Sequence, residues 1–219
     1  RRHTRLQGDW SSDVCSSDLA HKDFAASSVI NIGFAAMPYD YNGEYFKSNI
    51  MNYCFGGSFN SRLNLNLRED KDFTYGIRSG FSGTKYPGFF QISTSVRRTA
   101  TDSSLTEIFK EIRNFKSGLK DDEVSFTKSA LLNSEALRYE TLEQKAGFLS
   151  RIIRYDLPGD YTVTQSKILK DVTKDELNAL GTKYIDPSKM IILVVGNKYA
   201  IKDKIEKLGL GKVKEVELD

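Results

Sequence analysis

The sequence predicts an α+β fold in which an antiparallel-rich sheet packs with a block of helices. β-prone segments fall into two separated groups, near residues 27–35 and 73–96 and again near 190–218. The stretch between the groups carries apolar residues at helical spacing. Strands and helices therefore do not alternate along the chain as they do in a doubly wound parallel sheet.

The composition is that of an ordinary globular chain. The 219 residues include 32 Lys and Arg against 29 Asp and Glu, a net charge of +3, together with 13 Phe and 11 Tyr. That aromatic content excludes disorder, because it can bury enough apolar surface to offset the ordering entropy. The longest apolar run, Met190 to Val195, is far shorter than the roughly 20 residues of a membrane span. The near-neutral balance argues against a nucleic-acid binder.

Residues 1–19 differ from the rest of the chain. They are polar, lack any helical or strand period, and repeat Ser-Ser-Asp. We expect a non-native tail, because the segment resembles translated sequencing-adapter read-through, and a single domain over residues 20–219. A flexible natural linker is the alternative. No apolar core follows the arginines of the segment, so it is no secretory signal, and the sequence leaves the localisation unknown.

The first half of the domain predicts a strand and a hairpin. Residues 27–35 read as a strand, and a helix is expected from Glu44. Two alternating runs joined by a Gly- and Pro-containing loop predict an antiparallel hairpin. The expected faces are Phe73, Tyr75, Ile77, Ser79 and Phe81 on the first strand, and Phe90, Ile92, Thr94 and Val96 on the second.

Between the first helix and the hairpin lies a Gly-Gly-Ser sequence. Gly56 and Gly57 are expected to end the helix in a turn with positive φ, and Ser58 to cap a short second helix. The free backbone N–H groups at a helix start could instead bind a phosphate. We assign Gly56, Gly57 and Ser58 as candidate substrate-binding residues, with the helix-to-helix turn as the alternative.

The second half is predicted to be mostly helical. Capping boxes at Ser104–Glu107 and Thr173–Glu176 mark two helix starts. The remaining expected elements are helices at 121–139, 141–155 and 200–208, a buried strand at 190–195 and a β-prone tail at 212–218.

The chain lacks the residues for a metal site or a nucleophilic triad. Its only histidines are His3 and His21 and its only cysteines are Cys15 and Cys54. Neither the zinc motif H-E-x-x-H nor its inverse H-x-x-E-H can therefore be written. Zinc needs three or four protein ligands, most often His and Cys. We expect this chain to bind no metal and no cofactor.

One window carries a specific signature. Residues 54–80 read CFGGSFNSRLNLNLREDKDFTYGIRSG. This segment is similar to the insulinase/pitrilysin family of zinc peptidases, which includes the mitochondrial processing peptidases, and the resemblance extends over about residues 24–219. The matching positions are Gly56-Gly57, Ser61-Arg62-Leu63, Asn66-Leu67-Arg68-Glu69, Lys71 and Phe73-Thr74-Tyr75.

The resemblance implies a half-domain with a division of labour. In that family the zinc and its ligands lie on an N-terminal H-x-x-E-H domain, and a zinc-free C-terminal domain faces it across a chamber. The zinc-free domain supplies an Arg and a Tyr seven positions apart, which Arg68 and Tyr75 match. The implied partners are the missing zinc-bearing domain, on the same or a separate chain, and a peptide substrate.

Arg68 and Tyr75 are therefore the candidate catalytic residues. A guanidinium and a phenol are hydrogen-bond donors suited to a substrate carbonyl and to the oxyanion formed from it. The structural alternative is a surface Arg68 paired with Glu69 or Asp70 and a half-buried Tyr75. We expect peptide hydrolysis only together with the zinc-bearing domain, the isolated chain being inactive. A non-catalytic, partner-binding subunit of a peptidase-like assembly is the second hypothesis.

Overall fold

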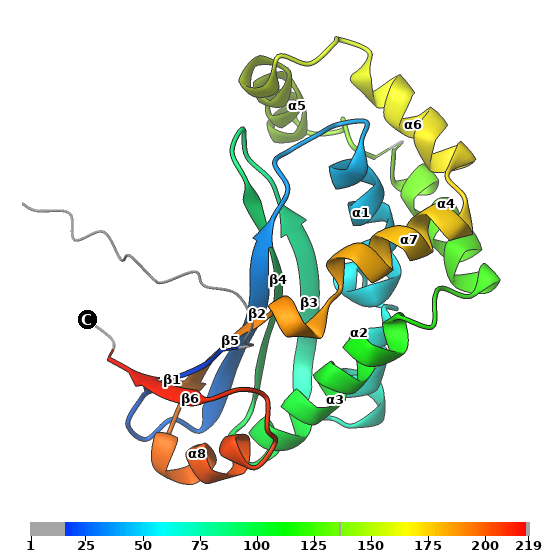
Figure 1. Ribbon diagram of the computed structural model, residues 1–219. Coiled ribbons are helices and arrows are strands. Elements are labelled where there is room, and N and C mark those ends of the chain that lie inside the picture. Colours follow the sequence, from blue (N-terminus) through cyan, green and yellow to red (C-terminus); the bar gives the residue numbers. More distant parts are fainter. Residues whose placement is uncertain (1–15, 136, 218–219) are drawn as a thin grey trace, which may run out of the picture.

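A computed structural model describes residues 16–135 and 137–217, and its centre is a six-stranded sheet in the order β3-β4-β2-β5-β1-β6 (Figure 1). The β3-β4, β4-β2 and β2-β5 pairs are antiparallel, whereas β1 pairs in parallel with β5 and β6. The α+β prediction is confirmed, with a sheet that is mixed rather than purely antiparallel. The strands are β1 (Ser17–His21), β2 (Ser27–Ala36), β3 (Thr74–Ser82), β4 (Gly88–Arg97), β5 (Ile191–Gly196) and β6 (Val213–Val216).

The helices α1, α3 and α7 lie on one side of the sheet, and α5 and α6 lie beyond the far end of β3 (Figure 1). Two wide π-helical turns, at Tyr53–Gly57 and Leu65–Asp70, extend α1 and α2. The helices are α1 (Glu44–Asn52), α2 (Arg62–Asn64), α3 (Thr101–Phe115), α4 (Asp121–Glu135), α5 (Leu142–Tyr155), α6 (Tyr161–Asp171), α7 (Lys174–Tyr184) and α8 (Lys198–Glu206).

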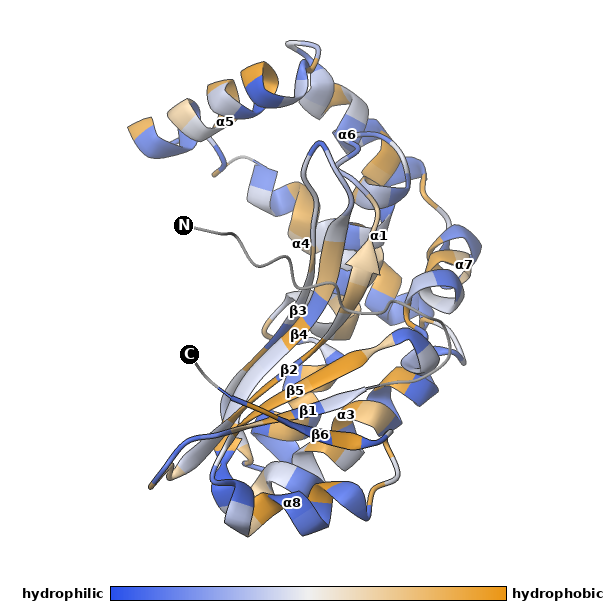
Figure 2. Cartoon of the chain, turned by 60° about the vertical axis from the view of Figure 1, so that its left-hand side comes forward, coloured by the Kyte–Doolittle hydropathy of each residue, from blue (hydrophilic) through white to orange (hydrophobic). Residues whose placement is uncertain are grey.

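The core lies between the helices and one face of the sheet. Ile32 on β2 is paired with Ile92 on β4 and with Ile192 on the hydrophobic strand β5 (Figure 2), and all three side chains are fully buried. Successive strand residues point to opposite faces, so the neighbouring odd-numbered positions form the other face. There Val29 and Phe89 are exposed, which leaves a partly apolar sheet face that the described helices do not cover.

Several sequence predictions are confirmed by these elements. The expected strand at 27–35 is β2, and the hairpin is β3 and β4. Thr173 caps α7 with the reciprocal Glu176 contact of a capping box. The box at Ser104 is wrong, because α3 begins earlier, at Thr101, whose hydroxyl donates to the Arg98 carbonyl oxygen at 2.8 Å. Ser104 is consequently buried within the helix, where its Oγ has no hydrogen-bond partner among the described residues.

The start of the domain also differs from the expectation. The chain from Ser17 to His21 forms β1, so the last three residues of the 1–19 segment lie in the sheet, and Leu19 is buried. A five-residue strand with one large apolar side chain is too short to show a period in the sequence. Residues 1–15 lie outside the described part of the chain, and the origin of the 1–19 segment stays a prediction.

The predicted face of β3 is wrong at its first residues. An irregularity of the ladder separates the Thr74–Val96 pair from the Ile77–Thr94 pair, so three steps on β3 match two on β4. An extra residue of this kind reverses the alternation on the bulged strand. Thr74 therefore points into the core and Tyr75 is fully exposed, instead of sharing the buried face of Ile77.

The two glycines after α1 serve close packing. Neither Gly56 nor Gly57 has the positive φ expected for a turn, a conformation that the structure gives to Gly118 instead. A Cβ on Gly56 would overlap the Ser79 hydroxyl and lie 2.8 Å from Leu63 Cδ1. Ser58 is extended and does not cap α2, whose N-cap position is Ser61. Gly56 thus lets the π-helical turn lie directly on β3.

Gly56→Ala should destabilise the protein, because its Cβ would collide with Ser79 on a strand that cannot move away. We expect a loss of about 1–3 kcal/mol in the free energy of unfolding, the usual cost of overpacking, measured by urea denaturation. Gly147→Ala in α5 is the matched control, since its Cβ would meet nothing within 4 Å and alanine favours a helix. Equal stability of the two variants would contradict this account of Gly56.

A partly buried ion pair joins α2 to the start of α4. Arg62 donates from Nε and Nη2 to the two Glu123 carboxylate oxygens at 2.6 Å each, and from Nη2 to the Gly118 carbonyl oxygen at 2.8 Å. Burial raises the pKa of Glu123, but the hydrogen bonds from Arg62 and from the Lys120 N–H outweigh it and hold that pKa below its ordinary value. The arginine of the Ser-Arg-Leu motif is thus a structural residue.

Arg62→Met should lower the free energy of unfolding by about 2–4 kcal/mol, because it leaves the partly buried Glu123 carboxylate without its ion-pair partner. The double variant Arg62→Met with Glu123→Leu should regain most of the loss. The folded-state pKa of Glu123 is lowered, so the gap between wild type and the single variant should be full at pH 7 and shrink as the pH falls below about 4.5. Thermal unfolding between pH 3 and 7 measures it, and a gap independent of pH would contradict the ion-pair account.

Candidate functional site

Arg68 and Tyr75 leave the same compact turn between α2 and β3. Asp72 adopts the left-handed conformation with φ of 51°, which reverses the chain. The Phe73 N–H donates to the Leu67 carbonyl oxygen at 2.9 Å. Because Leu67 adjoins Arg68 and Phe73 lies two residues before Tyr75, this bond ties together the two segments that carry the candidate residues, one on each side of the turn.

Asn64 fixes that turn against α2. Its Oδ1 accepts a hydrogen bond from the Ile77 N–H at 3.2 Å, and its Nδ2 donates to the Phe59 carbonyl oxygen at 2.8 Å. The amide thus supplies the acceptor for the Ile77 N–H directly after the bulge. The sequence analysis missed this positioning residue; the available signal was an amide between two leucines, Leu63 and Leu65, on a short helix.

The Arg68 guanidinium is accessible. Its carbon lies 4.2 Å from the centre of the Phe59 ring, and its Nε lies 3.3 Å from a Glu69 carboxylate oxygen. The ion pair with Glu69 is the one that the structural alternative expects. The ion pair uses Nε. The Nη groups donate no hydrogen bond to any described residue, so this outer edge of the guanidinium is available to a further acceptor.

The bulge of β3 presents Tyr75 outward. Thr74 is anchored below it, its hydroxyl donating to the Ser95 carbonyl oxygen at 2.8 Å and receiving the Thr94 hydroxyl at 2.9 Å. Tyr75 itself is 100% exposed, whereas the structural alternative expects a half-buried ring. Its phenol makes no hydrogen bond within the described chain, and is thus available as a donor.

The structure separates the other predicted site residues from this pair. Gly56 is buried against β3, Gly57 is partly covered by Asn52, and the Ser58 Oγ is buried with no hydrogen-bond partner in the described chain. Packing accounts for both glycines. Substrate binding by Gly56, Gly57 and Ser58 stays a prediction, as does the catalytic role of Arg68 and Tyr75.

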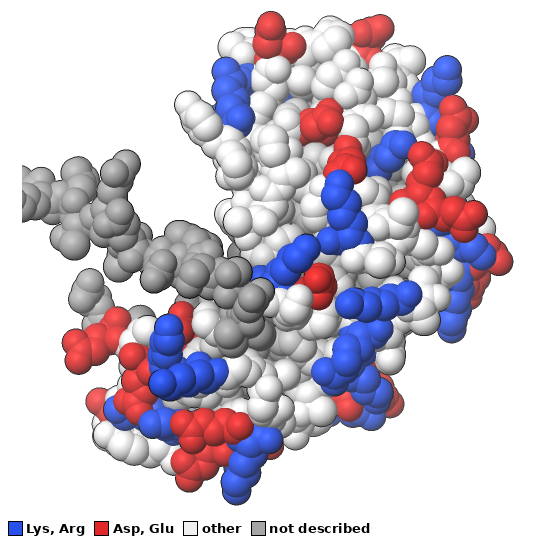
Figure 3. Space-filling model, in the orientation of Figure 1, with Lys and Arg blue, Asp and Glu red and all other residues white. Residues whose placement is uncertain are grey.

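The described residues do not fit a zinc ion. Within 16–135 and 137–217, no three His, Cys, Asp or Glu side chains lie close enough together to ligate a metal. No described helix has the length and apolar character to span a bilayer. On the face seen in Figure 3, acidic and basic side chains are interspersed. At the turn, the Arg68 guanidinium and the Tyr75 phenol are both hydrogen-bond donors.

Comparison with known proteins finds relatives in sequence and in structure. A curated relative, the "Non-peptidase homolog YmxG" of Helicobacter pylori, is 26% identical over 85% of this chain and 43% of its own length. A peptidase M16 inactive domain from Pseudomonas fluorescens superposes with a TM-score of 0.76 at 21% identity, over 85% of this chain and 45% of that one. A Helicobacter pylori protease superposes at 0.74 with 14% identity, over 82% and 43%.

These likenesses confirm the fold expected from the resemblance, and the chain spans less than half the length of each of these relatives. The family model described as "Peptidase M16 inactive domain" matches residues 6–131, which is more than half of the chain. This protein therefore belongs to the family of peptidase M16 inactive domains.

Proposed function

We propose that this chain is the zinc-free half of an M16-type peptidase and that Arg68 and Tyr75 bind the peptide bond being cleaved. The observation that carries the proposal is the exposed phenol of Tyr75, lifted from the sheet by the bulge and held on one turn with Arg68. Nothing in the packing of the described chain requires an exposed tyrosine at this position. A function outside the domain accounts for it.

The two donors have a defined task in this proposal. The phenol O–H and the outer guanidinium N–H groups donate to the carbonyl oxygen of the substrate. Negative charge grows on that oxygen as water attacks, so the bonds strengthen in the transition state. The Arg68 guanidinium is held in place by the Phe59 ring, whereas the Tyr75 side chain is fully exposed. In this proposal the arginine is therefore pre-organised, and the tyrosine side chain is fixed only when substrate binds.

The water-activating zinc belongs to the missing half in this proposal. The described part of this chain offers no ligand set, and the relatives are more than twice as long as the matched region. The sheet face bearing Val29 and Phe89, which the described helices leave open, is the surface through which the halves would meet or enclose substrate.

A second function is favoured by the curated relative, which is named a non-peptidase homolog. In this function the domain would be a scaffold that binds its partner and contributes no side chain to catalysis. Arg68 would then act only through its contacts with Phe59 and Glu69, and the phenol of Tyr75 would be dispensable. The two functions predict different effects on peptide cleavage when the Tyr75 hydroxyl is removed.

Tyr75→Phe should lower kcat for peptide cleavage about 10²–10³-fold, the usual effect of losing one oxyanion donor. The assay combines this chain with a separately expressed H-x-x-E-H domain, since neither should cleave alone. Arg68→Ala should lower kcat similarly. Because Tyr75 is fully exposed, the urea midpoint of Tyr75→Phe should equal that of wild type.

The matched control is Tyr86→Phe, which removes another exposed phenol from the loop between β3 and β4 and should leave kcat unchanged. Full activity of both Tyr75→Phe and Arg68→Ala, with partner binding intact, would establish the scaffold function instead. Cleavage by this chain alone that survives a chelator would contradict both.

A further inference from the structure

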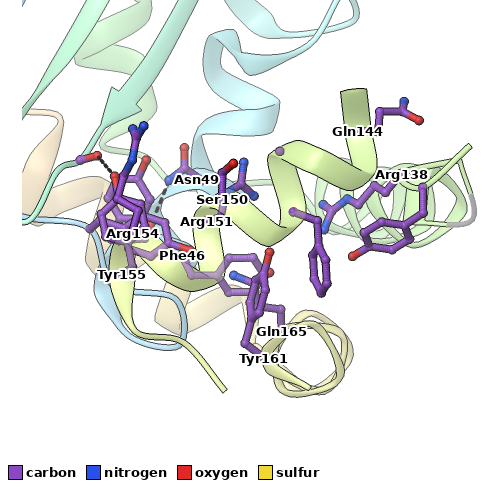
Figure 4. Close-up of a pocket in the computed structure, with 16 residues that line it drawn as sticks. Phe46, Asn49, Arg138, Gln144, Ser150, Arg151, Arg154, Tyr155, Tyr161 and Gln165 are labelled. Carbon is purple, nitrogen blue, oxygen red and sulfur yellow. Dashed lines mark hydrogen bonds between the residues drawn. The ribbon is translucent and has the colours of Figure 1, made fainter. Parts of the chain in front are cut away.

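A cavity of about 800 Å³ lies between α5, the connection from α4 to α5, the start of α6, and α1 with the segment leading into it (Figure 4). This volume is within the range of about 300–1,000 Å³ typical of ligand sites. It is remote from Tyr75, the second residue of β3, because Gly83 in its lining follows the last residue of that strand. The site proposed above does not use it.

The lining of the cavity is cationic. It includes Arg138, Arg151 and Arg154 and no Asp or Glu. No ion pair of these arginines is found within the described chain. Glu135 and Arg138 both line a smaller second cavity. The Glu135 carboxylate accepts a hydrogen bond from the Ser166 hydroxyl, which lies 2.8 Å from both of its oxygens. Unpaired guanidinium groups at a concave surface are suited to carboxylate or phosphate ligands.

The walls between the arginines are aromatic. The ring of Tyr39 stacks on that of Tyr155 with centroids 4.0 Å apart, and Phe148 stacks on Tyr161 at 5.5 Å. Burial raises the pKa of Tyr39 to about 12, although the nearby Arg151 lowers it in part. Tyr39 is therefore neutral at physiological pH and leaves the arginine charge uncompensated.

The cavity is elongated along one face of α5. The α5 residues that line it run from Gln144 to Tyr155 at helical spacing, with Gly147 between them. At 1.5 Å per residue this face is about 16 Å long, the length of about five residues of extended peptide. Arg138 precedes the helix, whereas Arg151 and Arg154 lie in its last turns. Charges separated in this way match carboxylates spaced along a chain better than one compact phosphate group.

We propose that this cavity binds an acidic, aromatic-containing segment of a peptide. The arginines would pair with its Asp or Glu side chains, and its aromatic side chain would enter between Tyr39 and Phe148. The proposal extends the peptide-binding role proposed above and so rests on it for the class of ligand. Its test uses binding by this chain alone and needs no partner domain.

The probe is a fluorescein-labelled eight-residue peptide with Glu residues on both sides of a central Phe, titrated with the full chain and followed by anisotropy. A peptide with Gln in place of every Glu should bind at least tenfold more weakly. The Arg151→Gln, Arg154→Gln double variant should likewise weaken the acidic peptide at least tenfold. Lys145→Gln removes a charge from α5 outside the cavity lining and should leave binding unchanged.

Gly147→Leu provides a test that leaves the charges intact. A Cβ at Gly147 meets no atom within 4 Å, so the leucine would project into the open cavity, and its higher helix propensity favours folding. It should weaken the acidic peptide at least tenfold, whereas Tyr75→Phe should not change binding. This second result separates the cavity from the proposed catalytic pair, so either proposal can fail alone.

Three outcomes would overturn the proposal. Equal affinity for the Glu and Gln peptides would exclude recognition of the carboxylates. Unchanged binding in both Gly147→Leu and the double arginine variant would place the peptide elsewhere. Complete displacement by ATP at concentrations well below those of unlabelled acidic peptide would identify a phosphate ligand instead.

Discussion

Burial of a single face of the sheet is the constraint on which the rest of the structure depends. Ile92, Ile32 and Ile192 form one fully buried row across three strands. Sliding any strand by one residue would turn its apolar set outward, so this row fixes the register of β4, β2 and β5. The position of β3 follows from its pairing with β4, and with it the position of the turn that carries the candidate site.

The same packing separates the residues of the family motif that hold the structure together, here called the frame, from the accessible side chains of Arg68 and Tyr75. Gly56 allows the turn after α1 to lie on Ser79, and Arg62 ties α2 to Glu123. Asn64 then holds the bulge through the Ile77 N–H. Within this frame the Tyr75 side chain is fully exposed, and Arg68 contacts Phe59 through its ring-facing side and Glu69 through its Nε. Structural and exposed residues thus share one motif, so a motif match by itself does not identify its functional members.

Sequence reasoning succeeded where one local pattern decides the structure. Alternation located β2 and β4 because each buries one full face, and Thr173 capped α7 because its box is purely local. It failed where contacts between distant residues decide the structure. The bulge before Ile77 depends on a hydrogen bond to Asn64, and Ser104 is not an N-cap because α3 begins earlier, at Thr101. Arg151 and Arg154 lie three residues apart on α5, but the sequence does not reveal that Arg138, which precedes that helix, lines the same cavity.

The two proposed binding regions lie at opposite ends of one edge strand. Tyr75 is the second residue of β3, and Gly83, in the cavity lining, follows its last residue. At about 3.3 Å per residue the eight steps between them span roughly 26 Å. An extended peptide that contacts both must therefore be at least about eight residues long, with its acidic segment that far from the bond facing Tyr75. If both proposals hold, the geometry of β3 would set a minimum length for the substrate, and the arginines of the cavity would select for its negative charge.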